Sequence, residues 1–386
     1  MRFHNFWSYR HMLLSRGFAK SLWSSRKNLL ADQNRLPLPA GPYMAELDIT
    51  YQCNLRCRMC QRWQDPRRDA LPLETYRNLA REFEELGVHQ ISIAGGEPLL
   101  REDVFRIIEG FAARGMSVNL CTNGMLVEKY RRDIAGSGAT CVTVSLDGAT
   151  AACHDGIRGR AGSYNEIERG IESFLAQRAN GTPILRVRMT VSDDNSREVR
   201  KFYADWRGVA DDVLFQPVHQ CGDAYYTGMQ KASLSVDAAV ISEQLQGTKL
   251  AKDPYMKQWV DSIEAGEGVP DAPCYAGVLM ARIDPWGHVY PCLEQHVSVG
   301  SVREEPFSRI WNSTALQQER KRISCDRTCR CWYNNTALIG HFGTLIKNTI
   351  PNGRRRYSSR WPQGGSPSRN PSPPSSFREP RSRSDT

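Results

Sequence analysis

The run Cys53-Asn54-Leu55-Arg56-Cys57-Arg58-Met59-Cys60 directly follows a strand-like segment at residues 44–50. Its three thiols stand at C-x3-C-x2-C spacing, on what we expect to be a single loop. Thiolates spaced in this way can hold three irons of a cubane iron–sulfur cluster, whereas full ligation by the protein takes four Cys. The spacing therefore predicts a cluster with one iron left open to a small chelating molecule.

Other uses of three clustered thiols fit the sequence less well. A structural zinc site usually shows paired C-x2-C halves that supply four ligands, and no fourth Cys or His lies nearby in the sequence. A disulfide framework is not expected in a 386-residue chain without a secretory signal. Three unrelated core cysteines remain the plain alternative, because free Cys is often buried.

Charge is distributed unevenly along the chain. The net charge is +9, yet residues 1–40 contain seven Lys and Arg against one acidic residue, and residues 351–386 contain eight Arg against two. The region between them is left slightly acidic. The basic character therefore belongs to the two ends, and we expect no nucleic acid to be bound by the fold itself.

The two ends also differ in pattern. Residues 6–30 mix aromatic and aliphatic side chains with five cations, which predicts a basic amphipathic helix within residues 1–40. This helix either packs on its own protein or makes contact with a membrane surface, and both alternatives stay open. Residues 351–386 are rich in Arg, Ser and Pro, and we expect them to be disordered.

Cysteine usage and hydropathy bear on localisation. Twelve cysteines without an export signal indicate a reducing cytoplasm, where thiolates bind metal rather than pair. No uninterrupted apolar stretch of about 18 residues occurs, so nothing is expected to span a membrane. The sequence therefore predicts a cytoplasmic protein, membrane-peripheral only if the N-terminal helix lies on a bilayer.

Short β-rich runs alternate with helical patterns between residues 41 and 219. Six such β/α repeats predict an α/β fold, a partial (β/α)6 TIM-like barrel with its chemistry on the loops after the strands. We expect strands at residues 44–50, 90–94, 117–121, 141–146, 184–191 and 212–216. We expect helices at residues 73–86, 101–114, 126–135, 163–177 and 196–206. Residues 220–273 should form a helical connector, and residues 274–335 a small cysteine-rich domain.

Polar turns follow several of these strands. The second strand runs into Ala94-Gly95-Gly96-Glu97-Pro98, where two glycines permit a ligand to approach the backbone closely. The third ends in Thr122-Asn123-Gly124 and the fourth in Ser145-Leu146-Asp147-Gly148, with Arg158 a little further on. Each turn alone is ordinary turn or N-cap chemistry. Their recurrence at the same end of successive strands predicts a polar rim around one site.

Together with the cysteine loop, these segments resemble the radical S-adenosylmethionine (SAM) superfamily. The resemblance implies that Cys53, Cys57 and Cys60 hold a [4Fe-4S] cluster and that SAM chelates its open iron. It implies that the Gly-Gly segment binds the amino group of SAM and that Arg158 reaches its carboxylate, a charge-assisted pairing, with a solvent-exposed role as the alternative. The implied SAM-binding residues are Gly95, Gly96, Glu97, Pro98, Thr122, Asn123, Ser145, Asp147 and Arg158.

A second cysteine-bearing region begins at Cys274. It contains Cys274-x12-Gly287-x4-Cys292, with a hairpin-like pattern between the two cysteines, and ends in Cys325-x3-Cys329-x-Cys331. This resembles the auxiliary-cluster extension called the SPASM or twitch domain. The resemblance to the superfamily thus covers residues from about 43 to 332.

The five cysteines are too few for the two auxiliary clusters of a full SPASM domain. The resemblance therefore implies one auxiliary [4Fe-4S] cluster, bound by Cys274, Cys292 and two of Cys325, Cys329 and Cys331. A zinc knuckle built from the same thiolates is the alternative. Four further cysteines lack cluster-like spacing, and we expect buried structural thiols there: Cys121, Cys141, Cys153 and Cys221.

The resemblance implies a radical SAM enzyme that cleaves SAM reductively to a 5′-deoxyadenosyl radical, which abstracts hydrogen from a substrate. It implies a flavodoxin or ferredoxin-type electron donor, with two-electron oxidation and carbon-centred coupling both open as outcomes. The substrate is left unidentified: a peptide, or a sugar, nucleotide, lipid-linked or other small molecule. About 40 residues precede the first strand, too few for the N-terminal peptide-binding domain of many peptide maturases.

Two interpretations in which the protein is not an enzyme remain open. One is a non-catalytic iron–sulfur or zinc scaffold that has lost turnover. The other is a membrane or nucleic-acid tether formed by the basic ends.

Overall fold

The computed structural model describes residues 18–33, 36–60, 62–68, 70–218, 236–265, 274–293 and 297–325. All of these lie within one compact unit, Met1–Thr349. The predicted tail, Cys221, Cys329, Cys331 and much of the predicted connector therefore lie outside the described residues.

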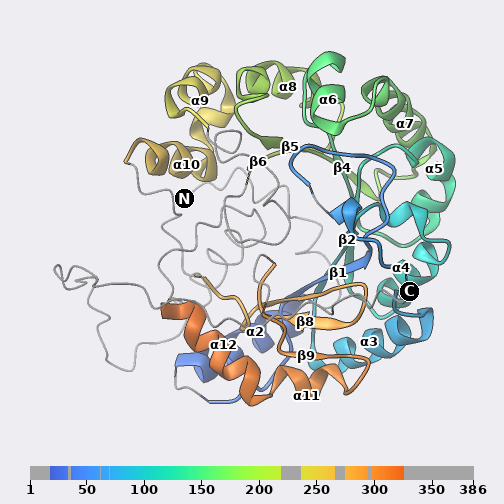
Figure 1. Cartoon of the computed structure of the whole chain (residues 1–386), viewed down its shortest axis with the longest axis vertical. Helices are drawn as coiled ribbons and strands as arrows, with labels where there is room; N and C mark the ends of the chain where they lie inside the picture. The colour runs from blue at the N-terminus through green and yellow to red at the C-terminus, as the bar shows by residue number, and fades with distance from the viewer. Residues whose placement is uncertain are drawn as a thin grey trace, which may run out of the picture. The chain divides into compact units, whose positions relative to one another are not determined.

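A mixed nine-stranded sheet organises the described part of the chain (Figure 1). Six parallel strands lie side by side in chain order. They are β1 (Met44–Thr50), β2 (Gln90–Gly95), β3 (Ser117–Thr122), β4 (Cys141–Ser145), β5 (Ile184–Val191) and β6 (Asp212–Pro217). Their buried, β-branched sequences are typical of a parallel sheet covered by helices.

Helices connect these strands and lie on the outer side of the sheet (Figure 1). They are α3 (Leu73–Leu86), α4 (Val104–Ala112), α5 (Val127–Gly136), α6 (Ala151–Arg158), α7 (Ser163–Gln177) and α8 (Val199–Trp206). Helix α3 shows why they form: Tyr76, Leu79 and Phe83 recur at helical spacing and are buried. It ends at Gly87, whose φ of 75° is left-handed and suits glycine.

The chain after β6 adds three more strands to the same sheet, next to β1 and away from β6. Helices α9 (Ala238–Leu245) and α10 (Pro254–Glu264) come first, followed by β7 (Met280–Ile283), which pairs in parallel with β1. Strands β8 (His288–Tyr290) and β9 (Gly300–Ser301) follow antiparallel, and then α11 (Phe307–Trp311) and α12 (Thr314–Cys325). Strand β1 therefore has a neighbour on each side.

The α/β class and the partial barrel predicted from the sequence are confirmed. The 44–50 and 184–191 strands and the 73–86 and 163–177 helices fall on the predicted residues. The predicted hairpin forms as β7 and β8, but it also extends the barrel sheet beyond β1, which the sequence pattern does not foresee. The predicted domain boundaries remain predictions.

Helix α2 (Phe18–Gln33) covers part of the predicted N-terminal helix, and residues 6–17 lie outside the described part. Its buried face is largely polar and includes Ser21, Ser25 and Asn28, whereas Trp23 is 55% exposed. The Asn28 amide nitrogen donates to the carbonyls of Ala40, Gly41 and Val278, and its oxygen accepts from the Ala40 N–H. Polar bonds, more than an apolar stripe, therefore hold this helix in place.

No helix among the described residues is both long enough and apolar enough to cross a membrane.

Replacing Asn28 with Ala should lower the free energy of unfolding by about 2 kcal/mol or more, because it leaves buried carbonyl groups unsatisfied. Urea unfolding monitored by far-UV circular dichroism measures the loss. Asn78→Ala, at an exposed position on α3, is the matched control and should be close to neutral. Equal midpoints for the two variants would show that Asn28 does not anchor the helix.

Candidate functional site

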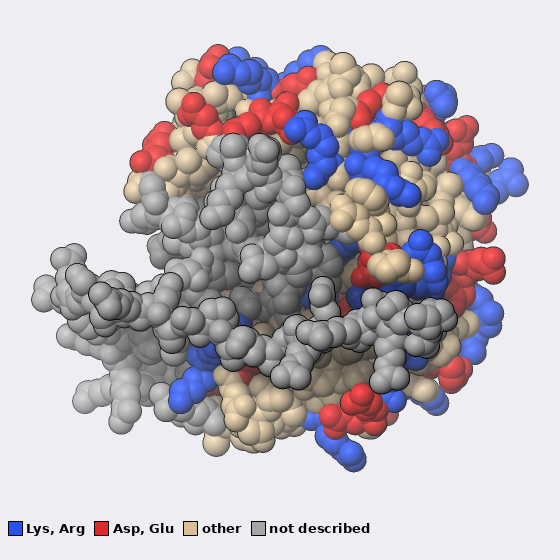
Figure 2. Space-filling model, viewed as in Figure 1, with Lys and Arg blue, Asp and Glu red and all other residues tan. Residues whose placement is uncertain are grey.

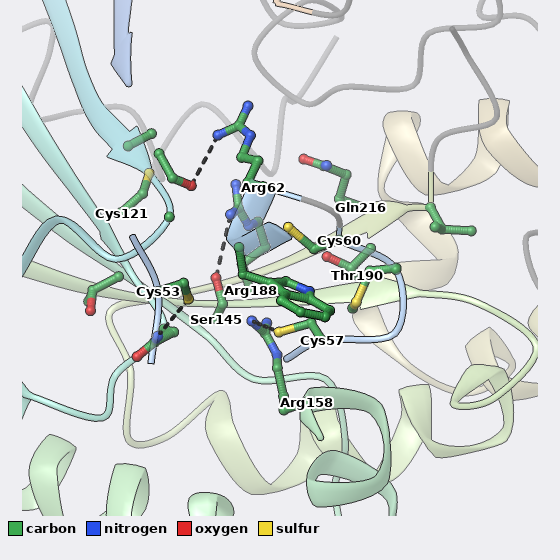
Figure 3. A pocket seen from close by; sticks show the side chains of 18 of the residues that line it. Cys53, Cys57, Cys60, Arg62, Cys121, Ser145, Arg158, Arg188, Thr190 and Gln216 are labelled. Carbon is green, nitrogen blue, oxygen red and sulfur yellow. Dashed lines mark hydrogen bonds between the residues drawn. The ribbon is translucent and has the colours of Figure 1, made fainter. Parts of the chain in front are cut away.

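The three cysteines of the first loop face one pocket near the carboxyl ends of the strands (Figure 3). Cys57 is buried, and Cys53 and Cys60 are half-buried. The loop is fastened to the end of α6, because the N–H groups of Arg56 and Arg58 donate to the carbonyls of Arg158 and Ile157 at 3.3 and 2.9 Å. The structure places the site after the first strand, as the sequence predicts.

Gly95 and Gly96 fit against the start of the same loop. The Gly96 N–H donates to the Thr50 carbonyl at 2.6 Å, and a Cβ on Gly96 would stand 2.2 Å from the Gln52 carbonyl oxygen. Gly95 has a φ of 130°, which side-chain-bearing residues rarely adopt. Both glycines line the pocket, so a backbone surface free of side chains faces the three thiols.

The thiols suit a cluster better than a single ion. No three Cys, His, Asp or Glu side chains among the described residues are arranged to hold one metal ion. In a cubane each thiolate binds its own iron and need not converge on one point, unlike the ligands of tetrahedral zinc. Burial raises the pKa of Cys57 to about 11, against the opposing effect of Arg158, and also raises the pKa of Cys53.

Arg158 is buried between the cysteine loop and β4. One guanidinium nitrogen lies 2.8 Å from an Asp147 carboxylate oxygen. Another donates to the Cys57 sulfur at 3.7 Å (Figure 3). The Thr190 N–H donates to the second Asp147 oxygen at 2.8 Å. Arg158 lines the pocket, whereas Asp147 lies behind it and orients the arginine. The guanidinium thus places a fixed positive charge beside a thiol.

Glu97 lies behind the rim of the pocket and is fully buried. Its carboxylate accepts from the Leu99 N–H at 3.0 Å, the Thr122 hydroxyl at 2.8 Å and the Asn123 N–H at 2.7 Å. Burial raises its pKa to about 7, although these bonds and Arg158 act in the opposite direction. Glu97 therefore joins the turns after β2 and β3, and neither it nor Pro98 lines the pocket.

The polar rim forms largely as the sequence predicts. Thr122, Asn123 and Ser145 line the pocket with the two glycines and Arg158. The Asn123 amide donates to the Asn54 side chain at 2.7 Å and to the Cys53 sulfur at 3.7 Å, which ties the third strand's turn to the cysteine loop.

The pocket has further lining residues beyond the predicted set, which come from the barrel interior, the cysteine loop and the segment after Cys292. They are Glu46, Met59, Arg62, Trp63, Ala94, Cys121, Arg188, Thr190, Gln216, Val218 and Leu293. Arg188 pairs in register with Ser145, and its guanidinium donates to that hydroxyl at 3.5 Å. Strand alternation could have found Glu46 and Arg188, because residues two apart share a face.

Cys121 differs from its prediction as a buried structural thiol. It is half-buried and lines the pocket, where it accepts from the Asn119 amide at 3.2 Å. Its place on the inward face of β3 is the physical reason. Cys141 is buried as expected, and Cys153 is half-buried.

Arg62 connects the far end of the loop to two strands. Its guanidinium donates to Asp48 on β1 at 2.8 Å and to the Gly95 carbonyl at 3.1 Å. The second Asp48 oxygen accepts from the Tyr51 hydroxyl, and the Arg282 guanidinium of β7 lies 3.9 Å from that same oxygen. The Gly-Gly turn, the cysteine loop and β7 therefore meet at one buried carboxylate.

In the second cysteine region, segments far apart in the sequence lie next to one another, and Cys274 itself is exposed. Cys292, which is buried, packs with Ala276 and Ile323 in a small apolar cluster. The Gly277 N–H donates to the Pro291 carbonyl at 2.6 Å, so the segment after Cys274 runs beside the segment before Cys292. Ile323 belongs to the last turn of α12, which ends at Cys325.

A half-closed parallel barrel with a three-cysteine loop and a glycine-lined pocket defines a class of iron–sulfur enzymes that use SAM. A model described as "Radical SAM superfamily" matches residues 47–203, and one described as "Iron-sulfur cluster-binding domain" (SPASM) matches residues 274–332. The chain belongs to the radical SAM superfamily and carries a C-terminal SPASM-type domain. It therefore binds SAM and a [4Fe-4S] cluster, and its second domain is of a kind that holds auxiliary iron–sulfur clusters.

Relatives and solved structures agree with this assignment. An AdoMet-dependent heme synthase of Methanosarcina barkeri is 27% identical, over 72% of this chain and 84% of its own length. A mycofactocin maturase of Mycolicibacterium smegmatis is 25% identical, over 78% and 76%. The Streptococcus suis protein SuiB bound to S-adenosylmethionine shares the fold, with a TM-score of 0.58, 16% identity and coverage of 80% and 75%.

The raised pKa of Glu97 predicts a pH dependence of stability. Between the ordinary value of 4.5 and about 7, the folded state keeps a proton that the unfolded chain has lost. The contribution of Glu97 to stability should therefore fall as the pH rises through this window and level off above it. Glu97→Gln should remove this component. Urea unfolding midpoints, measured from pH 5 to 8 in steps of about half a pH unit, test this.

Glu102→Gln, at an exposed position on the same connection, is the control and should follow the wild-type pH profile. The Glu97→Gln variant should also be less stable than wild type at the acidic end, because the amide nitrogen that replaces one carboxylate oxygen cannot accept from the Asn123 N–H. His154, whose pKa burial lowers to about 3, contributes in the opposite direction below about pH 6.5, so the test is the difference between the two proteins. A difference in stability between wild type and Glu97→Gln that stays constant from pH 5 to 8 would contradict the assignment.

Proposed function

We propose that the protein is a catalytically active radical SAM enzyme rather than a scaffold. The carrying observation is that Cys53, Cys57 and Cys60 line the same pocket as the Gly95–Gly96 backbone and Arg158. A scaffold needs thiols that hold a cluster, but it needs no glycine-lined cavity and no fixed charge beside them. The cavity supports an enzyme that admits a small molecule next to the cluster.

Cys53, Cys57 and Cys60 would hold the SAM-binding [4Fe-4S] cluster. When bound, the cluster and SAM supply one-electron cleavage and a 5′-deoxyadenosyl radical that abstracts hydrogen from substrate, so the protein's share is positioning. Asn123 restrains Cys53, and Arg158 restrains Cys57. The apolar residues Met59 and Leu293 and the ring of Trp63 line the pocket and limit the access of water.

The glycines and the polar rim would bind SAM directly. Gly95 and Gly96 offer backbone groups to its amino end, and Thr122, Asn123 and Ser145 offer hydrogen bonds around it. Arg158 would bind the SAM carboxylate while Asp147 keeps the guanidinium oriented. Glu97, Pro98 and Asp147, which the sequence suggested as SAM contacts, would act from behind the rim as positioning residues.

Cys274, Cys292 and two of Cys325, Cys329 and Cys331 would bind one auxiliary [4Fe-4S] cluster. The packing of Ile323 against Cys292 supports this set, because it directs the end of α12 toward the first pair.

The substrate would be polar and either a peptide or a small molecule. Glu46, Arg188 and Gln216 line the inner part of the pocket, and such groups suit hydrogen-bonding rather than purely apolar substrates. Relatives carry the names heme synthase and mycofactocin maturase, and a structure with the same fold is described as SuiB bound to its precursor peptide SuiA. A flavodoxin or ferredoxin-type protein would supply the electron.

Changing Cys53, Cys57 and Cys60 together to Ala should remove about four of about eight irons from the anaerobically reconstituted protein and abolish 5′-deoxyadenosine formation under dithionite. The cause is loss of every protein ligand to one cluster. Iron and sulfide counting and chromatography of the nucleoside products measure the two effects.

Cys141→Ala is the matched control, since this thiol is buried away from the pocket, and it should keep both iron and turnover. Wild-type protein that carries its clusters but yields no 5′-deoxyadenosine with any reductant would favour the scaffold.

Arg158→Lys should weaken SAM binding by roughly tenfold to a hundredfold while the iron content is unchanged, because Lys lacks the fork that contacts two partners at once. Equilibrium dialysis of labelled SAM against the anaerobic protein measures the affinity. Arg160→Lys, at an exposed neighbouring position, should bind like wild type. An unchanged affinity in the Arg158→Lys variant would restrict Arg158 to bracing the loop.

A further inference from the structure

One half of helix α2 holds only apolar and cationic residues among the side chains that the structure describes. Leu22, Trp23 and Lys27 are exposed there, whereas Lys20 donates to the Glu84 carbonyl of α3. At 3.6 residues per turn, six of the described side chains share this half: Lys20, Leu22, Trp23, Arg26, Lys27 and Leu30. The opposite half holds the buried Ser21, Ser25, Asn28 and Leu29. We call the first set the outer face of α2. The helix has one acidic residue, Asp32, which lies with the buried half and pairs with Arg320 of α12.

Trp23 is the most unusual member of the outer face. It is 55% exposed, and no other aromatic side chain among the described residues is as open to solvent. The Arg26 guanidinium and the Lys27 ammonium lie 5.4 and 5.6 Å from the centre of its ring system. Leu22 beside it is 37% exposed. An exposed apolar patch bordered by cations marks an interaction surface.

We propose that the outer face of α2 binds the surface of an anionic lipid bilayer. Indole rings favour the level of the headgroups, and each nearby Lys or Arg is attracted by anionic lipid. Nucleic acid fits less well, because exposed Leu22 gains nothing from a phosphate backbone. In Figure 2, acidic and basic side chains are interspersed over the visible described surface, so the charge of that surface does not favour nucleic acid.

The position of α2 fixes the orientation of the bound protein. Asn28 contacts Ala40 and Gly41, just before β1, and Val278, just before β7. The helix therefore lies at the amino ends of these parallel strands, whereas the pocket lies toward their carboxyl ends. A protein held by α2 would keep its pocket turned away from the bilayer and open to substrates in solution.

Flotation of the full-length protein with vesicles tests this proposal. Vesicles of phosphatidylcholine and phosphatidylglycerol should carry the protein upward at low salt and lose it at high salt, and vesicles of pure phosphatidylcholine should not bind it. Lys27→Glu should lower the partition coefficient by roughly fivefold or more, the contribution of a single cation. Adding Trp23→Ser to this variant should lower the partition coefficient further and weaken the part of vesicle binding that does not depend on salt.

The double variant Lys201→Glu with Val209→Ser, on α8 and in the turn after it, is the matched control, because it changes one exposed cation and one exposed apolar residue elsewhere. It should bind vesicles like wild type. Equal binding of the wild type and the α2 variants would overturn the proposal and assign any tethering to another segment. Stronger retention of wild type by single-stranded RNA than by anionic vesicles would overturn it too. Vesicle binding is measured without SAM turnover, so its result is independent of the proposed function.

Discussion

The ion pair between Arg158 and Asp147 is the contact on which the arrangement of the pocket depends. Both side chains are buried, and the pair joins the end of α6 to the turn after β4 while the same guanidinium reaches the Cys57 sulfur. A buried pair of this kind is weak evidence for stability, since a well-packed apolar pair of similar volume is often as stable. Its role is better explained by what it holds in place, a positive charge beside the Cys57 thiol.

Sequence patterns predicted the barrel well where periodicity was strong. Helix α3 and strand β5 have the predicted limits, because their apolar residues recur at clear helical and strand spacing. Helix α6 was not predicted, since it is short and contains Gly156 near its end. The Thr150 hydroxyl, which accepts from the Cys153 N–H at 3.3 Å, and packing under the cysteine loop give it a stability that local propensity does not.

The sequence predicted which residues belong to the site better than it predicted where their side chains point. The motif containing Glu97 indicated a SAM contact, yet its carboxylate turns away from the pocket toward three donors. Sequence order cannot distinguish a residue that touches a ligand from one that holds its neighbour, because both lie in the same turn. Cys121 shows the reverse case, in which a residue without any motif reaches the pocket through the alternation of a strand.

Strand β1 connects the two cysteine regions within one sheet. It carries the first cysteine loop at its carboxyl end and pairs with β2 on one side and β7 on the other. Asp48 on this strand receives Arg62 from the loop and lies close to Arg282 from β7, and Arg282 in turn lies 4.3 Å from the ring centre of Tyr290 on β8. Because all of these groups are buried or half-buried, a shift of the hairpin would disturb the contact between Arg62 and the Gly95 carbonyl. The hairpin leading to Cys292 is therefore a structural support of the Gly95–Gly96 turn as well as part of the SPASM-type domain.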